Sequence, residues 1–518
     1  MNGADRLCET LLANDIDVCF ANPGTSEMHF VAALDRRPQM RCVLGLFEGV
    51  VTGAADGYAR MADKPAATLL HLGPGLANGL ANLHNARRAR TPMINVVGDH
   101  ATYFLKHDAP LASDIDSLAR PMSQWYGRIG RAEEVEAKTL EAYEAAMRLP
   151  GVATLVLPAD AAWGELPAGT PPRRASLPPF RSVTPEAVRQ AAETLRSGRR
   201  VALLLTGRAL RADALATADR IAAATGARLL MQTSNSRVER GAGRVAIDNV
   251  PYPVDAALAA LADIDAMIVV GAKVPVAFFA YPGKPGLLVR EDCEIVDLAR
   301  PGDDLAEALA WLADEIGVAA EAAVRVSRGF TDEMALPGGT LTDDAVALAV
   351  ARMLPEGAIV CDESITAGAR FFGLSQDSAP HDYLRITGGS IGIGIPLAAG
   401  AAVACPDRKV VALQADGSGM FTVQGLWTQA RERLDIVTVV FANRSYAILE
   451  GEMRNVGVNH FGRNAERMLT LDNPALDWVS MARGMGVEAG RAETVEDFVR
   501  LFDGALRQRG PFLIEAVV

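Results

Sequence analysis

The sequence predicts an α/β chain built from three doubly wound parallel-sheet domains. Three observations carry this prediction: the chain has 518 residues, half of them are hydrophobic, and short apolar runs alternate with Ala- and Leu-rich helical stretches. At about 150 residues per domain, this length suggests about three domains. Continuous apolar strands between amphipathic helices are typical of parallel sheets that are covered on both faces.

Two stretches rich in proline, glycine or basic residues divide the chain into segments of similar size. They span Pro167–Val183 and Ser327–Thr340, and both are typical of exposed connections between domains. We therefore expect an N-terminal domain over residues 1–168, a central domain over 184–326 and a C-terminal domain over 340–518.

Each segment contains apolar runs that we expect to form buried parallel strands. Between the earliest runs, small and apolar residues predict helices over Gly49–Met61 and Leu76–Arg88. In chain order, the expected strands are Val18–Phe20, Ala67–Leu70, Met93–Val97, Val201–Leu205, Ala266–Val270, Ala358–Val360, Lys409–Leu413 and Val437–Phe441.

Composition excludes several classes of partner. The net charge is −12, which argues against nucleic acid or an anionic membrane surface as a partner. The six cysteines form no CxxC pair and suit a reducing compartment, so we expect a cytoplasmic protein. No apolar run reaches ~18 residues, and the first residues do not resemble a signal peptide. A small molecule is the expected substrate.

Oxygen-bearing side chains follow two expected strands of the C-terminal segment. Asp416 comes just after one strand, and Asn443 and Ser445 follow the next. Ligands of open α/β sheets bind at the carboxyl ends of the strands, and Mg²⁺ prefers carboxylate, amide and carbonyl oxygens. Gly417 and Ser418 place backbone N–H groups where phosphate oxygens could approach. The pattern therefore predicts a magnesium and diphosphate site.

The same segment carries a family resemblance. Ala415–Gly417, followed after 25 residues by Asn443, resemble the GDG-(about 25 residues)-N motif of thiamine diphosphate-dependent enzymes, with Ala415 in place of the usual glycine. The resemblance covers essentially the whole chain and implies pyrimidine-binding, central and diphosphate-binding domains, in that order. It implies thiamine diphosphate and Mg²⁺ as cofactors, with Asp416, Asn443 and Ser445 as the metal ligands.

A second segment resembles the catalytic-glutamate region of the same enzymes. Leu44–Glu48 puts a carboxylate at the end of an apolar run, and a helix of small residues, Gly49–Arg60, follows. The resemblance implies that Glu48 is catalytic. It would share a proton with the pyrimidine N1′ of the cofactor, so that the cofactor's own 4′-amino group can remove the C2 proton.

Two further segments complete the expected cofactor site. Ile386–Pro396 resembles the glycine-rich segment of the family, which implies that Ile391 wedges beneath the bent cofactor and that the Gly389 carbonyl accepts a hydrogen bond from it. Hydroxyl groups of Asp362–Thr366 are expected to reach the diphosphate. The expected cofactor-binding residues are Glu48, Gly389, Ile391, Gly417, Ser418, Ser364, Thr366 and Tyr446.

The resemblance also bears on assembly and on a second cofactor. In this superfamily the glutamate and the diphosphate motif meet across a subunit interface, so we expect at least a homodimer and favour a homotetramer. Some relatives bind FAD in the central domain. This chain has no GxGxxG motif there and is short for such a member, which disfavours FAD.

Part of the first domain resembles benzoylformate decarboxylases. Asn22–Glu27 matches their NPGS-x-E segment, which implies that Thr25 and His71 are catalytic and contact the substrate. The same resemblance predicts a histidine near Phe279–Tyr281, where none occurs, and an aromatic residue at the position of Glu452. These departures disfavour benzoylformate itself.

Another part resembles acetolactate synthases. Gly73–Asn78 matches their GPG-x-x-N loop, although Asp99 replaces a glutamine that they carry. His107 falls in a loop that holds a histidine pair in pyruvate decarboxylases, where a solvated side chain and a substrate contact are equally compatible with the sequence. The expected substrate residues are Thr25, His71, Asn78, His107, Ile448 and Glu452.

We therefore expect an enzyme that decarboxylates a 2-oxo acid, joins the resulting fragment to a second carbonyl compound as acetolactate synthases do, or both. The alternatives are a lyase that releases an aldehyde, similar to benzoylformate decarboxylase, and a non-catalytic paralogue that keeps the fold. An NAD-dependent oxidoreductase is disfavoured because its glycine fingerprint is absent.

Overall fold

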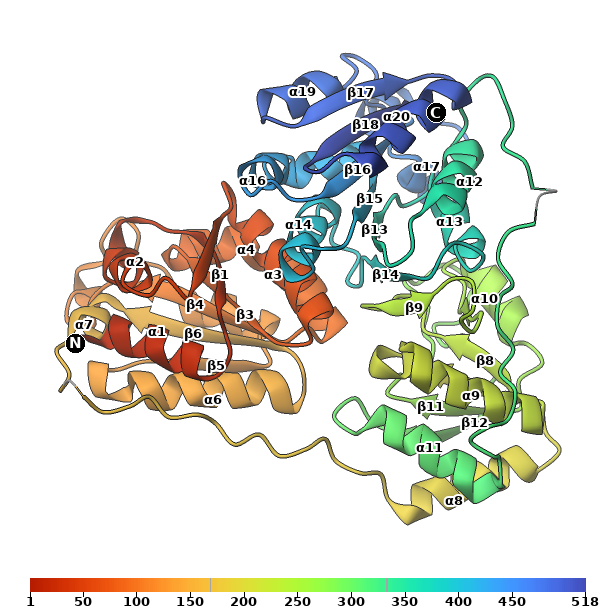
Figure 1. Ribbon diagram of the computed structural model, residues 1–518, viewed down its shortest axis with the longest axis horizontal. Coiled ribbons are helices and arrows are strands. Elements are labelled where there is room, and N and C mark those ends of the chain that lie inside the picture. Colours follow the sequence, from red (N-terminus) through yellow and green to blue (C-terminus); the bar gives the residue numbers. More distant parts are fainter. Residues whose placement is uncertain (168, 332–333) are drawn as a thin grey trace.

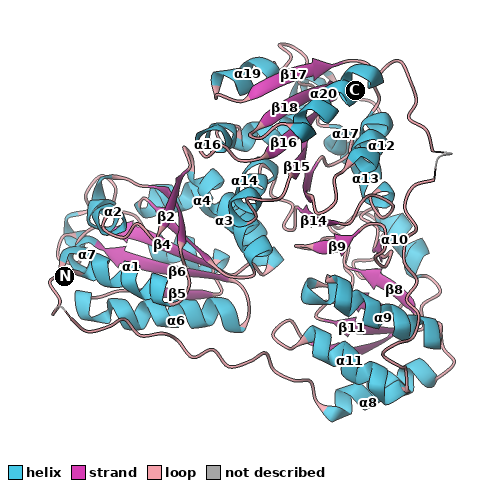
Figure 2. Ribbon diagram, viewed as in Figure 1, coloured by secondary structure: helices cyan, strands magenta, loops and turns pink. Residues whose placement is uncertain are grey.

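The computed structural model describes residues 1–167, 169–331 and 334–518, and these contain three sheets that are mainly parallel. Figure 1 shows them in chain order, and Figure 2 shows strands flanked by helices. The predicted fold class is confirmed. The boundaries of the predicted domains stay a prediction, and residues 168 and 332–333, within the two expected linkers, lie outside the described residues.

The first sheet has six parallel strands in the order β2-β1-β3-β4-β6-β5. Its strands are β1 (Val18–Asn22), β2 (Arg41–Leu44), β3 (Ala66–Leu70), β4 (Met93–Asp99), β5 (Trp125–Arg128) and β6 (Val152–Pro158). Its helices are α1 (Gly3–Ala13), α2 (Met28–Asp35), α3 (Glu48–Ala62), α4 (Leu72–Ala89), α5 (Ile115–Ala119), α6 (Val135–Arg148) and α7 (Ala159–Trp163).

The second sheet has five parallel strands in the order β10-β8-β7-β11-β12. The strands are β7 (Val201–Leu205), β8 (Arg228–Met231), β10 (Asp248–Asn249), β11 (Ala266–Val270) and β12 (Glu294–Ala299). The helices are α8 (Pro185–Arg196), α9 (Ala212–Thr225), α10 (Val254–Leu261) and α11 (Leu305–Ile316).

The third sheet has the order β17-β18-β16-β15-β13-β14-β9. The strands are β13 (Ile359–Glu363), β14 (His381–Arg385), β15 (Val410–Ala415), β16 (Ile436–Ala442), β17 (Glu488–Ala492), β18 (Phe512–Val517) and β9 (Val238–Arg240). The helices are α12 (Asp343–Met353), α13 (Ala369–Leu374), α14 (Gly394–Ala404), α15 (Asp416–Gly419), α16 (Gly425–Arg431), α17 (Ala447–Asn455), α18 (Arg463–Leu469), α19 (Trp478–Gly484) and α20 (Val495–Arg507).

Strand β9 is unexpected, because it comes from the middle segment and pairs antiparallel with β14 at the edge of the third sheet. The Arg240 guanidinium lies 3.7 Å from the centre of the Phe372 ring and donates a hydrogen bond to the Phe372 carbonyl. This contact fixes a three-residue strand that is too short to show an alternating pattern in the sequence.

The first and third domains share one apolar core, because α3 packs directly against α14. The two helices approach closely at glycines. A Cβ added at Gly57 would lie 2.0 Å from the Leu397 carbonyl oxygen, and one added at Gly400 would lie 1.8 Å from the Ala54 carbonyl oxygen. Any larger residue would therefore push the helices apart.

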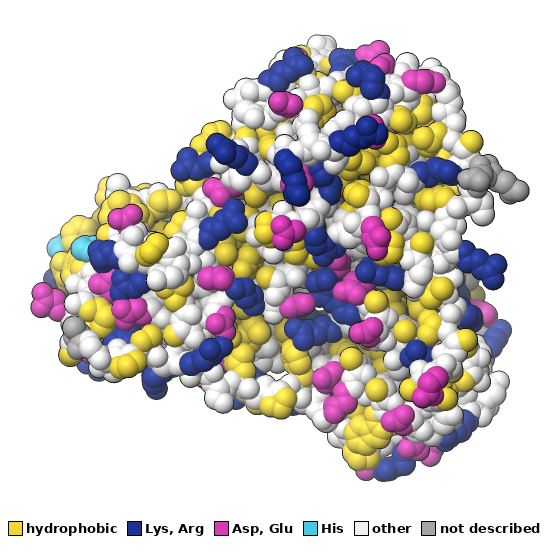
Figure 3. All heavy atoms as spheres, viewed as in Figure 1, with side chains coloured by type: hydrophobic (Ala, Val, Ile, Leu, Met, Phe, Trp, Pro, Cys, Tyr) yellow, Lys and Arg dark blue, Asp and Glu magenta, His cyan; other side chains and the backbone are white. Residues whose placement is uncertain are grey.

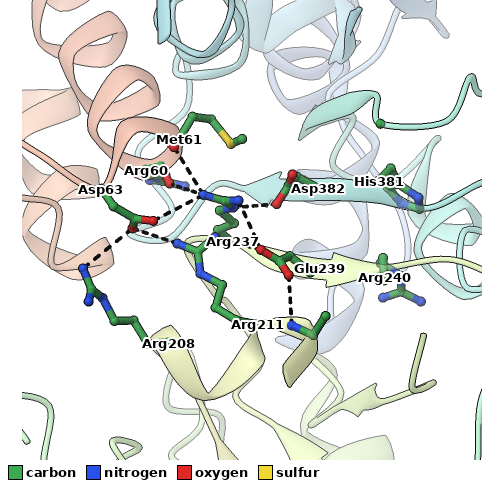
Figure 4. Close-up of polar contacts among 12 residues, drawn as sticks. Arg60, Met61, Asp63, Arg208, Arg211, Arg237, Glu239, Arg240, His381 and Asp382 are labelled. Carbon is green, nitrogen blue, oxygen red and sulfur yellow. Dashed lines mark hydrogen bonds and ion pairs between the residues drawn. The ribbon is translucent and has the colours of Figure 1, made fainter. Parts of the chain in front are cut away.

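Arg237 ties the three domains together (Figure 4). Its guanidinium lies 3.7 Å from the carboxylate of Asp63 after α3, 3.2 Å from that of Glu239 and 2.5 Å from that of Asp382 in β14. A cavity of about 1100 Å³ lies beside this network, and Figure 3 shows Lys and Arg side chains gathered in the hollow there. No helix in the described chain is both long and apolar enough to cross a bilayer.

Candidate active site

The structure brings Asp416 together with the segment Asn443–Ser445 at the ends of the neighbouring strands β15 and β16. Asp416 is buried, and its carboxylate accepts hydrogen bonds from the backbone N–H groups of Arg444 (2.7 Å) and Gly417 (2.8 Å). Burial raises the pKa of Asp416, and its carboxylate forms no salt bridge with any described residue. Such a buried anion calls for a cation.

The surrounding groups fit a magnesium ion and a diphosphate. The amide oxygen of Asn443 accepts a hydrogen bond from the Ser445 N–H (3.1 Å), which orients a second hard oxygen in the segment that contacts Asp416 through the Arg444 N–H. A Cβ added at Gly417 would lie 2.5 Å from the Tyr446 ring, so only glycine leaves this backbone open. Arg444 adopts a left-handed φ of 56°, a strained conformation that is concentrated at functional loops.

A buried glutamate that the sequence did not single out shapes the glycine-rich loop. The Glu363 carboxylate accepts hydrogen bonds from the backbone N–H groups of Gly392 (2.6 Å) and Gly394 (2.7 Å) and from the Gln414 amide (3.0 Å). Burial raises the pKa of Glu363. The sequence places Glu363 at the end of an apolar strand, which is the one feature that could have identified it. Its hydrogen-bond partners lie 29 residues or more away in the chain.

The first domain also holds this loop. The Asn85 side chain of α4 accepts a hydrogen bond from the Gly388 N–H (3.0 Å) and donates one to the Ser390 carbonyl (2.6 Å). Asn82 donates to the carbonyls of Gly49 (2.8 Å) and Gly392 (3.2 Å). The sequence does not identify either asparagine as a site residue, because a helix of mixed composition does not indicate what its polar face contacts.

Gly389 and Ile391 lie in this loop, and Gly389 has a left-handed φ of 75°. Ser364 is buried, and its hydroxyl donates to the Asp362 carboxylate (2.6 Å), while Thr366 is half-buried. Between them, Ile365 has a φ of 55°, which is rare for a β-branched residue. Ser418 accepts a hydrogen bond from Gln414 (2.6 Å), so its hydroxyl is oriented next to Asp416.

Glu48 differs slightly from expectation, because β2 ends at Leu44 and Glu48 is the first residue of α3. Its buried carboxylate accepts a hydrogen bond from the Asn78 amide (2.9 Å), and Asn78 lies in α4, not in a loop. A Cβ added at Gly75 would lie 3.1 Å from Glu48 Oε1, so glycine gives the carboxylate its room. No hydrogen bond or salt bridge among the described residues joins Glu48 to Asp416.

The structure places His71 against a carboxylate that the sequence analysis did not select. His71 Nδ1 lies 2.8 Å from Glu27 Oε2, and the Ser26 hydroxyl donates to Glu27 Oε1 (2.5 Å). The buried Glu27 also accepts the Gly24 N–H (2.8 Å), which closes the turn. Thr25 is exposed in this turn, next to these contacts, and none of the described hydrogen bonds involves its side chain.

The remaining expected substrate residues are dispersed. His107 is exposed in a short 3₁₀ turn, where its ring packs 5.3 Å from that of Phe104, and none of the described contacts joins it to His71. Ile448 and Glu452 lie in α17, which begins shortly after the segment Asn443–Ser445. Glu452 accepts hydrogen bonds from Tyr252 and Tyr281 of the central domain.

Two family models match parts of this chain, and named proteins resemble the whole of it. Residues 1–119 match the family "Thiamine pyrophosphate enzyme, N-terminal TPP binding domain", and residues 365–516 match its C-terminal TPP binding domain. The chain is 49% identical to the Mycobacterium tuberculosis protein named "Putative acetolactate synthase large subunit IlvX", over 100% of this chain and 99% of that one.

Two further proteins resemble the whole chain. Benzoylformate decarboxylase of Pseudomonas aeruginosa is 28% identical over 98% of this chain and 97% of that protein. The solved structure of a thiamine diphosphate-dependent 4-hydroxybenzoylformate decarboxylase from Rhodococcus jostii superposes with a TM-score of 0.86, at 26% identity, over 99% of this chain and 98% of that one.

Proposed function

This chain belongs to the thiamine pyrophosphate enzyme family, and from that premise we propose that it decarboxylates a 2-oxo acid with thiamine diphosphate and Mg²⁺. The observation that carries the proposal is the buried Asp416 carboxylate, which has no cation partner in the described chain and lies beside Asn443. After decarboxylation, the fragment is joined to a second 2-oxo acid or an aldehyde, as in an acetolactate synthase.

The diphosphate-binding domain would hold both cofactors. Asp416, the Asn443 amide and the Ser445 carbonyl would bind Mg²⁺ through hard oxygens. Contacts to thiamine diphosphate would come from the glycine-rich loop and from the segments that follow β13, β15 and β16: Gly389, Ile391, Gly417, Ser418, Ser364, Thr366 and Tyr446. When bound, thiamine diphosphate supplies an electron sink for the electron pair that remains when carbon dioxide departs.

Glu48 would activate the cofactor, because a buried carboxylate can hold a proton on a ring nitrogen that contacts it. Asn78 donates to Glu48 Oε2 and so leaves Oε1 for that nitrogen. His71 would handle protons of the substrate. Since Glu27 occupies Nδ1 as an acceptor, the proton of a neutral His71 stays on Nδ1 and Nε2 remains available to the substrate. Thr25 and His107 would contribute further polar contacts.

The assembly belongs to the same proposal. We infer at least a homodimer, with a homotetramer favoured, because apolar side chains next to both halves of the site are exposed in the single chain. Leu46, two residues before Glu48, is 48% exposed, and Phe421, which packs against Gly392, is 51% exposed. A cytoplasmic location and the absence of FAD stay predictions, and flavin absorption of the purified protein tests the latter.

A lyase that releases an aldehyde is the second candidate, supported by the NPGTSE turn beside His71 and by the decarboxylases that resemble the chain. A panel of 2-oxo acids, with release of carbon dioxide measured and products identified, separates the two. Acetolactate from pyruvate supports the synthase, and aldehyde alone supports the lyase. Absence of turnover, together with absence of calorimetric binding of thiamine diphosphate and Mg²⁺, would favour a non-catalytic paralogue.

A further inference from the structure

A carboxylate between two tyrosines lies at the contact of the central and C-terminal domains. Glu452 of α17 accepts a hydrogen bond from the Tyr281 hydroxyl (2.7 Å) and a longer one from the Tyr252 hydroxyl (3.3 Å). All three residues are only half-buried, so the group remains accessible from solvent.

Glu452 has no cation partner among the described residues. The two nearby basic side chains pair with other acids: Arg454 lies 3.4 Å from Glu450, and Lys284 lies 2.7 Å from Asp255. Two tyrosine hydroxyls orient the carboxylate, but they do not neutralise it.

A row of aromatic rings extends from Tyr252, one of the two tyrosines that contact this carboxylate. The Tyr252 and Phe278 rings lie 5.3 Å apart, and the Phe278 and Phe279 rings lie 5.1 Å apart. Phe278 and Phe279 are 44% and 52% exposed, which is unusual for phenylalanine. Aromatic faces next to a carboxylate form the environment that proteins use to bind organic cations.

The same rings connect Glu452 to the expected cofactor site. A Cβ added at Gly389 would lie 2.8 Å from the tip of the Phe278 ring, so Phe278 touches the loop that is expected to contact the cofactor. From there the contacts run through Tyr252 to Glu452. Helix α17 also begins directly after the metal-site segment, and Ile448 lies one turn before Glu452 on the same face.

We propose that Glu452 selects 2-oxo acids whose far end carries a positive charge, as an ammonium or guanidinium group does. The inference rests on the proposed function, because it concerns the substrate of that site. An apolar far end would desolvate Glu452 without compensation, and a second carboxylate would be repelled by it. A cation gains both the carboxylate and the aromatic faces.

Three substrates test the selectivity: a 2-oxo acid with a terminal guanidinium, its uncharged alkyl counterpart of equal chain length, and a 2-oxo dicarboxylate. We expect the wild-type enzyme to prefer the guanidinium compound over the uncharged one by about tenfold in kcat/KM. In Glu452→Gln this ratio should fall to about one, since glutamine still accepts a tyrosine hydrogen bond but carries no charge.

Tyr281→Phe is the matched control, because it removes the shorter hydrogen bond and leaves the charge. It should keep the preference, whereas a merely structural role for Glu452 predicts equal loss in both variants. Pyruvate is included as a common reference. Two results would overturn the proposed selectivity but not the proposed function. One is turnover of neutral 2-oxo acids with no preference for the cationic one, and the other is an unchanged kcat/KM ratio in Glu452→Gln. Failure of all four compounds would overturn the proposed function as well.

Discussion

The imidazole of His71 rests against the buried carboxylate of Glu27, with Nδ1 and Oε2 2.8 Å apart. A carboxylate in this position fixes the ring and its tautomer, as an orienting residue does in many catalytic pairs. Because Glu27 is also held by the Ser26 hydroxyl and the Gly24 N–H, the pair is rigid before any substrate arrives.

This pair predicts a non-additive double-mutant cycle. His71→Ala should lower kcat by about 10²-fold or more, since it removes the group that would transfer protons. Glu27→Gln should lower kcat by about tenfold, because the glutamine amide can present a donor to Nδ1 and disturb the tautomer. The double variant should be no slower than His71→Ala. Steady-state kinetics measures all three, and purely additive losses would show that Glu27 acts independently of His71.

Glu48 should be needed for turnover and not for binding of the cofactor. Glu48→Gln keeps the shape of the side chain, but it cannot share a proton with the ring nitrogen. We expect kcat to fall by about 10²- to 10⁴-fold, while calorimetry still detects binding of thiamine diphosphate with Mg²⁺. Near-normal activity in this variant would remove Glu48 from the mechanism.

Asp416, unlike Glu48, should be needed for binding of the cofactor, which a thermal-shift experiment measures. Thiamine diphosphate with Mg²⁺ stabilises the wild-type protein because the ligands bind only the folded state. Asp416→Asn should lose this shift. Without cofactor its Tm should fall somewhat, because the asparagine amide can accept only one of the two backbone N–H groups that the carboxylate accepts, so the ligand-induced shift is measured against each variant's own Tm. The exposed Asp407→Asn is the control and should keep the whole shift.

Mixed dimers test whether the site spans two subunits. If Glu48 of one chain serves the Asp416 of its partner, a dimer of one Glu48→Gln and one Asp416→Asn chain contains one intact site. Random assembly of equal amounts should then restore about a quarter of the wild-type activity, since half the dimers are mixed and each has one of two sites. Both variants are inactive alone in this prediction. A mixture that stays inactive after subunit exchange would place the whole site within one chain.

His381 should make the fold sensitive to acid. It is buried, and burial lowers its pKa to about 3 from an ordinary value of 6.5. The ring is therefore neutral in the folded protein, while the unfolded chain takes up a proton below pH 6.5. The neutral His381 ring therefore contributes its full stabilisation above pH 6.5. As the pH falls toward 3 the free energy of unfolding decreases progressively, by about 2 kcal/mol at pH 5.

His381→Asn keeps a donor for the Ala379 carbonyl, which accepts from His381 Nδ1 at 2.8 Å, and it removes the titrating group. Denaturant unfolding at pH 7 and pH 5 should show a smaller loss of stability in this variant than in the wild type. The exposed His460→Asn should behave like the wild type. Equal pH dependence of all three proteins would assign the acid sensitivity to other groups.

The site was partly predictable because its most specific residues are local in the chain. Asp416 and Asn443 follow apolar runs, and parallel strands bring their carboxyl ends to one edge of a sheet. Glu363, Asn85 and Glu27 could not be identified from the sequence. Each contacts backbone or side-chain groups that are distant in the chain or that belong to no motif. Their partners are known only from the folded chain: Glu363 and Asn85 bind the loop at 388–394, and Glu27 contacts the ring of His71.

The amino-acid pattern alone predicts the three parallel sheets, the strand ends at which Asp416 and Asn443 lie, and the family of the chain. Those properties depend on hydrophobic periodicity and on residue spacing within short segments, that is, on residues that are close together in the chain. The tertiary contacts are needed to show that β9 joins the third sheet, that Arg237 connects three domains and that Glu452 lies between two tyrosines with no cation partner in the described residues. Each of these depends on contacts between residues that are far apart in the chain, and neither composition nor periodicity encodes such distances.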